Sequence, residues 1–223
     1  MTDIDDAVRV YLAPAEYIDS DHPAIRARAG EICRAHATPR ARAGAAYLAA
    51  REIRYGYVDH ADLEVYRASS VLAAGYGYCV GKAAVFAALC RASGIPARVA
   101  FADVTNHLST ERLRAGMGTS VFAWHGFTEL MLDGRWLKAS PTFNASLCGR
   151  YGVAPLEFDG ASDALLQAFD SEGRTFMRYE RIRESFHDVP AKFLRDEMAR
   201  LYPELVRSDD LKGRTMEEDL ASA

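Results

Sequence analysis

The chain has 223 residues, of which 49% are hydrophobic and 26% charged, with a formal net charge of −4 at pH 7. These values are ordinary for a globular protein that buries a substantial core. They exclude the concentrated basic face of a nucleic-acid-binding protein, and no stretch reaches the roughly 18 uncharged apolar residues of a membrane span. The acidic N-terminus has no apolar signal core. We therefore expect one cytoplasmic domain over residues 1–223, with neither a nucleic-acid nor a membrane partner.

The four cysteines are scattered along the chain without any CxxC pair. A chain of this size folds without disulfide bonds. The six histidines show no HExxH motif or other paired ligand spacing. We expect reduced thiols, no structural metal and no cofactor.

Two helices are predicted in the first quarter of the chain, after an extended lead-in (1–21) in which residues 8–14 would form a short strand. The first begins after the acidic cap position Asp21. The second has Thr38 as its cap and Pro39 at its first helical position. The apolar stripe of the second helix consists of Ala43, Ala46, Tyr47 and Ala50.

The segment 79–93 is predicted to be the central helix of the core. Its only charged residues are Lys82 and Arg91, so the helix is apolar nearly all round. Gly94 suits the left-handed position that ends a helix. The preceding residues 55–78, rich in Gly, Tyr and small residues, are predicted to form a loop with short helical pieces.

Strand-like segments follow at 97–104, 120–132 and 135–139. Asp133-Gly134 joins the last two and is a strong signal for a two-residue hairpin. The residues between the first two strands (105–119) are predicted to be a polar loop.

The C-terminal third is less informative. Residues 164–170 and 175–186 are predicted to pair as antiparallel strands, and 190–205 to form a helix that begins at a proline. The charged last dozen residues are expected to fray. Helices first and antiparallel strands afterwards indicate an α+β fold.

Cys79 occupies the predicted first position of the buried helix. Unpaired backbone N–H groups and the positive end of the helix dipole meet there and favour the reactive thiolate. The glycines before it leave room for a substrate carbonyl. Cys90 lies in the middle of the same helix and Cys33 on the apolar stripe of the first, so both are interpreted as core thiols.

A cysteine nucleophile needs a base within hydrogen-bonding reach, and His125 is the best candidate. It lies within a predicted strand, where alternation places Phe127 and Glu129 on its own face. A structural histidine with satisfied hydrogen bonds is the alternative at this position. We interpret Glu129 as a surface or supporting carboxylate and Trp124 as a core residue.

Two stretches resemble the transglutaminase-like superfamily, whose papain-related fold serves cysteine proteases, amidases and acyl transferases. "GYGYCVGKAAVFAALCRASGIPAR" contains Gly77-Tyr78-Cys79 before a buried helix, and "WHGFTELMLDGRWLKASPTFN" contains His125 with Phe127 and Glu129. The similarity covers roughly residues 40–145. It implies a central buried helix that carries the cysteine and packs against an antiparallel sheet, with Cys79 as nucleophile and His125 as base. Residues 155–205 are then a family-specific addition, of which 155–170 are expected to bound the cleft.

The third motif of the family is usually Asp-Pro-Thr, whose aspartate orients the histidine. Here Ser140 stands at that position. A serine hydroxyl accepts the imidazole N–H but supplies no negative charge. We rank Ser140 first as the orienting residue, Asn144 second and Asp103 third; loss of turnover is a further alternative.

The resemblance implies a thiol-dependent acyl-transfer enzyme that acts on a peptide, a protein or another amide through a Cys79 thioester. We favour hydrolysis, with amine transfer or a catalytically silent peptide-binding protein as alternatives. The loops at 55–78, 105–119 and 145–164 are expected to control the access of water. Tyr76 and Tyr78 are both candidates to line the cleft. The acidic residues show no calcium-loop spacing.

Overall fold

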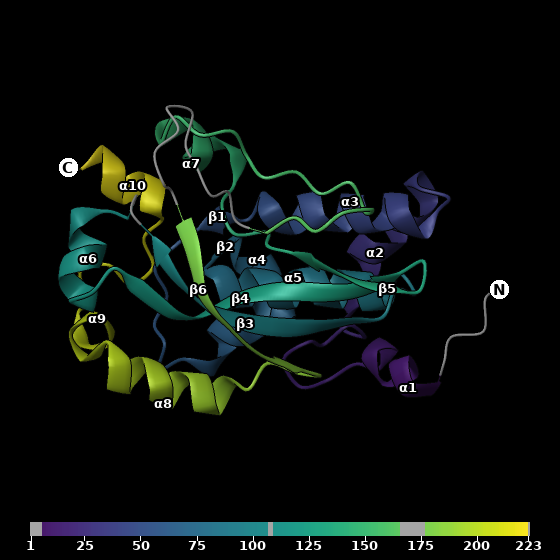
Figure 1. The fold of residues 1–223 in the computed structure, drawn as a ribbon, viewed down its shortest axis with the longest axis horizontal. Helices are drawn as coiled ribbons and strands as arrows, with labels where there is room; N and C mark the ends of the chain where they lie inside the picture. The colour runs from purple at the N-terminus through teal and green to yellow at the C-terminus, as the bar shows by residue number, and fades with distance from the viewer. Residues whose placement is uncertain (1–5, 107–108, 166–176, 223) are drawn as a thin grey trace.

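The computed structural model describes residues 6–106, 109–165 and 177–222. Helix α5 (Cys79–Ala92) packs against a four-stranded antiparallel sheet with the strand order β5-β4-β3-β6 (Figure 1). The strands are β3 (Ala97–Asn106), β4 (Val121–Leu132), β5 (Arg135–Ala139) and β6 (Met177–Phe186). The predicted α+β class, with a central cysteine-bearing helix on an antiparallel sheet, is confirmed.

Helix α5 is buried from Cys79 to Arg91, as its apolar composition predicts. Both of its charged side chains are buried as well, because backbone carbonyls satisfy them. The Arg91 guanidinium donates to the carbonyl oxygens of Ala97 (2.9 Å) and Ala13 (2.6 Å). Gly94 adopts the predicted left-handed conformation, with φ 80°.

Three helices surround α5 on the side away from the sheet: α2 (Pro23–Ala35), α3 (Pro39–Arg51) and α4 (Ala68–Ala74). Thr38 caps α3 as predicted, and its Oγ1 accepts from the Ala41 N–H at 3.2 Å. The cap of α2 differs from the prediction, since the acceptor is His22 Nδ1 instead of Asp21. The buried stripe of α3 contains all four predicted residues: Ala43, Ala46, Tyr47 and Ala50.

The predicted β4–β5 hairpin is confirmed. Asp133 and Gly134 form its turn with φ values of 50° and 76°, and Leu132 pairs with Arg135. Asp and Gly tolerate the positive φ that this tight turn requires. The central strand β3 pairs with β4 on one side and β6 on the other.

Several connecting segments differ from the prediction. Residues 8–14 form no strand; they contain the end of α1 (Asp6–Arg9) and the short 3₁₀ helix η1 (Val10–Leu12). The predicted polar loop at 105–119 contains helix α6 (Glu111–Met117), which Thr110 caps through Leu113 N–H at 3.2 Å. A seven-residue helix carries too few apolar repeats to show a period in the sequence.

The predicted loop at 55–78 contains the 3₁₀ helix η2 (Leu63–Tyr66), helix α4 and strand β2 (Tyr76–Gly77). Strand β2 pairs in parallel with β1 (Arg54–Tyr55). The short helical pieces are therefore confirmed, whereas the parallel pair was not predicted.

The C-terminal region is more ordered than predicted. Strand β6 pairs with β3, and most of the predicted partner segment 164–170 lies outside the described residues. The predicted helix 190–205 divides at Tyr202 into α8 (Ala191–Leu201) and α9 (Pro203–Arg207), because Pro203 cannot continue a helix. Instead of fraying, the tail forms α10 (Met216–Ala221) behind a Thr215/Glu218 capping box. Helix α7 (Ala145–Arg150) lies between β5 and β6.

Among the described residues, no helix combines the length and apolar character needed to cross a bilayer. The four cysteines are free thiols. The described part of the chain contains no cluster of three or more His, Cys, Asp or Glu residues that could hold a metal ion.

Candidate active site

Cys79 is the first residue of α5, and its side chain is buried, with 8% exposed. Burial raises the pKa of the Cys79 thiol to about 11, while hydrogen bonds from the backbone N–H groups of Gly126, Val80 and Cys79 itself act in the opposite direction. The helix N-terminus therefore favours thiolate as expected, but removal from water has the larger effect. The thiol is therefore protonated near pH 7.

His125 lies on β4 with 4% of its surface exposed. Its Nε2 hydrogen-bonds Ser140 Oγ at 3.2 Å, and Ser140 Oγ in turn bonds Thr142 Oγ1 at 2.8 Å. Burial lowers the pKa of His125 to about 3, so the imidazole is neutral near pH 7. With Nε2 occupied by Ser140, Nδ1 is the ring nitrogen left for proton transfer.

Strand β4 is pressed directly against the start of α5, and this contact brings Cys79 and His125 together. A Cβ atom on Gly126 would lie 2.8 Å from Val80 Cα, so glycine alone permits the approach. Thr128 Oγ1 donates to the Ala83 carbonyl at 2.9 Å and fixes the register of strand on helix. The neighbours of the two predicted site residues are thus in contact, and both site residues line one cavity.

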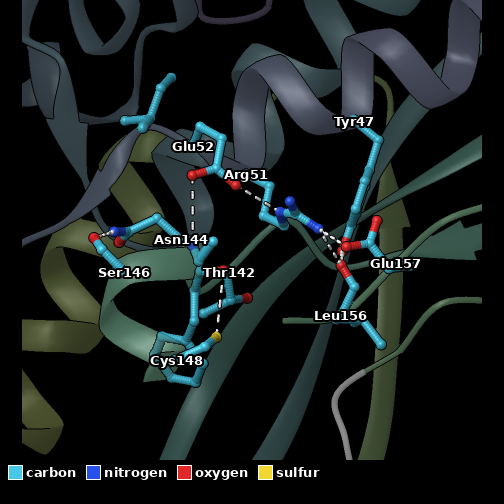
Figure 2. Close-up of polar contacts among 12 residues, drawn as sticks. Tyr47, Arg51, Glu52, Thr142, Asn144, Ser146, Cys148, Leu156 and Glu157 are labelled. Carbon is cyan, nitrogen blue, oxygen red and sulfur yellow. Dashed lines mark hydrogen bonds and ion pairs between the residues drawn. The ribbon is translucent and has the colours of Figure 1, made fainter. Parts of the chain in front are cut away.

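The other two candidates for orienting His125 are engaged elsewhere. Asn144 accepts the Tyr55 N–H at 3.0 Å and donates to Ser146 at 2.8 Å, the side chain toward which it points in Figure 2. Asp103 forms two hydrogen bonds with Arg183 (2.6 and 2.8 Å) and accepts from the Trp124 backbone N–H. Of the three candidates, Ser140 is the one that the fold places on the ring.

Lys82 lies one helical turn after Cys79 and is fully buried. Its ammonium group donates to the carbonyl oxygens of Arg51 (2.9 Å), Ile53 and Thr142 (2.6 Å). Burial lowers the pKa of Lys82 to about 7, but three carbonyl acceptors favour the protonated form. Lys82 thus joins the cysteine helix to the end of α3 and to the segment that carries Ser140.

Tyr55 is a site residue that sequence reasoning missed. It pairs with Gly77 in the parallel β1–β2 ladder and lines the cavity beside Cys79. Burial raises the pKa of Tyr55 well above its usual value, and the charge of Cys79 and a hydrogen bond with its side chain raise it further. The one signal in the sequence was the "IRYGY" ending of the helix before it, which carries no chemistry by itself.

Residues 214–219 hold the chain just after Tyr55 in place. Gly56 forms an antiparallel bridge with Thr215, and the Tyr57 N–H donates to the Arg214 carbonyl at 2.8 Å. The Tyr57 hydroxyl donates to Asp219 at 3.0 Å. The segment around α10 therefore pairs with the chain that follows Tyr55.

Trp124 precedes His125 and has the left-handed backbone angle φ 59°, which is strained for a bulky residue. Its indole N–H donates to Glu197 Oε2 at 3.0 Å, and Arg183 lies 4.0 Å above the ring centre. These contacts offset the strain and hold the strand in the bend that precedes His125. Trp124 lines the cavity as well as packing against the core.

Apolar side chains make up most of the cavity wall. They come from β4, α6, α8, α9 and the turn after α9, and comprise Leu113, Met117, Phe122, Leu194, Met198, Leu205 and Leu211. Of the loops expected to control access, 55–78 and 105–119 contribute lining residues, whereas none of the residues lining this cavity belongs to 145–164. Residues 155–170 were expected to bound the cleft, but none of their described residues (155–165) lines this cavity; α8 and α9, farther along the chain, form part of the wall.

The segment after α7 is instead fastened to α3. Figure 2 shows Arg51 reaching Glu157 (2.6 Å) and the Leu156 carbonyl (3.0 Å), which also accepts from Tyr47. These bonds explain why that segment does not line the cleft.

Three further residues near the site in sequence lie outside the cavity wall. Glu129 is buried and not on the surface, and it pairs with Arg98 at 2.7 Å and Ser185 at 2.8 Å. Trp136 packs its ring against Tyr11 and Arg98. Tyr76 packs beside Gly56 and does not line the cavity, whereas Tyr78 does.

The comparison with known families agrees with this geometry. A family model described as "Transglutaminase-like superfamily" matches residues 26–141, just over half of the chain. The chain belongs to the transglutaminase-like superfamily. No curated protein matches it.

A solved structure with a similar arrangement is titled as a "Putative Cysteine Protease from Cytophaga hutchinsonii". It is 17% identical in sequence, with a TM-score of 0.47, over 82% of this chain and 54% of that chain. This transglutaminase-like chain therefore spans about half the length of that protein.

Proposed function

We propose that this transglutaminase-like protein is a thiol-dependent acyl-transfer enzyme in which Cys79 is the nucleophile, His125 the base and Ser140 the residue that orients His125. One observation carries the proposal: a cysteine at the N-terminus of a buried helix shares a cavity with a histidine whose Nε2 is held by Ser140. Nucleophile, base and orienting group are the three parts that covalent catalysis by cysteine requires.

In the first half-reaction His125 takes the Cys79 proton, and the sulfur attacks the carbonyl carbon of an amide. Backbone N–H groups at the start of α5 stabilise the negative charge that develops on the carbonyl oxygen. The carbon–nitrogen bond then breaks, His125 returns the proton to the leaving amine, and an acyl group remains on Cys79 as a thioester.

We propose further that water resolves the thioester, so that the protein is a hydrolase of peptides or other amides. Water needs no built acceptor site, whereas amine transfer requires a second organic substrate to be bound and water to be excluded. In the hydrolytic step His125 takes a proton from water, and the water oxygen attacks the thioester carbon. The carbon–sulfur bond then breaks, His125 returns the proton to the sulfur, and the acid and the Cys79 thiol are released.

The test is the rate of iodoacetamide alkylation at Cys79, measured by mass spectrometry in the wild type and in His125→Ala. We expect the variant to react at least tenfold more slowly near pH 8, because general-base assistance contributes on this scale or more. The free thiol Cys33, half-buried on α2, is the internal control. Equal rates at Cys79 in the two proteins would refute the proposed pair.

A protein that binds peptides without turnover is the second candidate function. It is favoured by Ser140, which cannot stabilise an imidazolium by charge, and by the neutral state of both Cys79 and His125. If a peptide amide library gives no product while Cys79→Ala still binds those peptides, the binding function replaces the catalytic one.

A further inference from the structure

The cavity beside Cys79 continues away from the reacting sulfur into a chamber with apolar walls. Leu113 and Met117 of α6, Leu194 and Met198 of α8, and Leu205 of α9 form it. Helices α6, α8 and α9 gather at one end of the molecule, opposite α1 (Figure 1), and α9 contacts both α6 and α8. These walls come mainly from the region of the chain outside the family match at 26–141.

The polar groups at this chamber are already neutral or paired. Lys212 lies at its edge but interacts with Asp209 at 2.9 Å and Asp59 at 3.6 Å. His60 is buried, and burial lowers its pKa to about 4, so it is uncharged near pH 7. A charged substrate group entering the chamber would lose water without gaining an opposite charge, which is costly.

The size of the chamber also restricts its occupant. The whole cavity, with the part beside Cys79 included, has a volume of about 80 Å³, which is room for about six water molecules at 10–15 Å³ each. One aliphatic or aromatic side chain occupies a comparable space.

We propose that this chamber is a specificity pocket that takes one uncharged aliphatic or aromatic side chain, next to the carbonyl that Cys79 attacks. The inference rests on the proposed function and adds its substrate class: peptide-like amides with a large apolar residue at that position. Burying such a side chain in a preformed apolar pocket favours it over a charged one by about tenfold to a hundredfold.

Peptidyl chloromethyl ketones that differ in one residue test this proposal. The Cys79 sulfur displaces chloride and forms a carbon–sulfur bond, so labelling reports on the pocket without any turnover. The probes carry Leu, Phe, Ala, Gln, Glu or Lys beside the reactive carbon. We expect the Leu and Phe probes to label Cys79 at least tenfold faster than the Gln, Glu and Lys probes.

Leu205→Glu places a carboxylate in the wall at a half-buried position that tolerates it. We expect this variant to lose at least tenfold in rate with the Leu probe and to gain with the Lys probe. Leu48→Glu is the matched control, because Leu48 is 42% exposed on α3 and does not line the cavity.

Similar labelling by all six probes in the wild type would overturn the specificity pocket, as would an unchanged order of rates in Leu205→Glu. Iodoacetamide labelling separates this failure from failure of the proposed function. If iodoacetamide still labels Cys79 more slowly in His125→Ala than in the wild type, the nucleophile–base pair stands. The inferred substrate class alone is then wrong.

Discussion

At the scale of single residues, Ser140 orients His125 without adding a charge to the site. Its hydroxyl holds His125 Nε2 at 3.2 Å and is itself held by Thr142. A hydroxyl fixes the ring but adds no negative charge to balance an imidazolium. Burial keeps both Cys79 and His125 neutral near pH 7, so in the proposed reaction a proton must pass to His125 as the sulfur attacks.

Ser140→Asp restores a carboxylate at this position. An opposite charge within hydrogen-bonding distance raises the pKa of a histidine by about 1–3 units, so we expect alkylation of Cys79 at pH 7 to become tenfold faster or more. Ser140→Ala removes the hydrogen bond and should slow alkylation several-fold. Equal rates in all three proteins would show that position 140 does not act on His125.

The pH dependence of the wild type follows from the same neutral pair. Because burial raises the pKa of Cys79 to about 11, thiolate accumulates only as the pH rises toward that value. We expect the iodoacetamide rate at Cys79 to increase steadily between pH 7 and 10 and to show no plateau. A plateau reached below pH 7 would reveal a stable thiolate–imidazolium pair and contradict this expectation.

The residues of the candidate site could be singled out from the sequence because each lies in a short local motif. Gly77-Tyr78-Cys79 opens a recognisable apolar helix, and His125 and Ser140 lie at set distances along the next strands. Tyr55 and Leu205 could not be predicted, since contacts distant in sequence alone bring them to the cavity. Lys82 resembles an ordinary solvent-facing lysine until the fold shows its three carbonyl partners.

At the scale of secondary-structure elements, the buried Lys82 side chain connects helix α5 to three other segments of the chain. Its ammonium group satisfies carbonyls at the end of α3, before β1 and after β5. Lys82→Met leaves these buried acceptors without a donor, at a cost of about 3 kcal/mol in the free energy of unfolding. Urea denaturation measures this loss, with the exposed Lys192→Met of α8 as the control. A loss no larger than that of the control would show that water replaces the ammonium.

Strand β4 touches the start of helix α5 at Gly126. Gly126→Ala places a methyl group 2.8 Å from Val80 Cα, so strand and helix must separate. We expect a loss of about 1–3 kcal/mol in unfolding free energy and slower alkylation of Cys79. Gly149→Ala is the matched control, because no atom lies within 4 Å of its added Cβ. Thermal unfolding of Gly126→Ala and Gly149→Ala measures the loss of stability in each variant.

Elements were predictable where they are long and carry their own start and stop signals. Thr38-Pro39 and Asp133-Gly134 are such signals, and both mark the observed boundaries. The strands β1 and β2 have two residues each and exist because they pair across some twenty intervening residues. Nothing in their local composition distinguishes them from loop. Helix α10 was missed because its charge suggested fraying, while its capping box was overlooked.

At the scale of the whole molecule, the N-terminal and central segments supply the reacting groups, and the C-terminal segments supply much of the wall. Helix α8 also restrains the site directly through Glu197, which accepts from the indole N–H of Trp124 at 3.0 Å. Helices α8 and α9, which follow the family match, are therefore part of the cavity wall.

Two buried histidines make the folded state sensitive to acid. Burial lowers the pKa of His60 to about 4 and of His125 to about 3, whereas the unfolded chain binds these protons near pH 6.5. The contribution of these two histidines to stability is therefore fully present above pH 6.5. Below that value the free energy of unfolding decreases as the pH falls toward 4, by up to about 1.4 kcal/mol per pH unit for each histidine.

Urea denaturation at pH 7 and pH 5 measures this loss. His60→Gln removes one of the two groups and should reduce the difference between the two pH values, while His36→Gln at the end of α2 serves as the control. An unchanged difference in His60→Gln would assign the acid sensitivity to other groups.

The bridge between Gly56 and Thr215 has a consequence for the order in which the protein becomes functional during translation. Domains begin to fold from the N-terminus while synthesis continues, and Cys79 leaves the ribosome well before residue 215. Gly56 and Tyr57 can take their final pairing only when residues 214 and 215 have been made. A nascent chain would thus carry Cys79 before Gly56 and Tyr57 have their final partners, so the cavity beside the thiol would be completed only after the cysteine itself has been made.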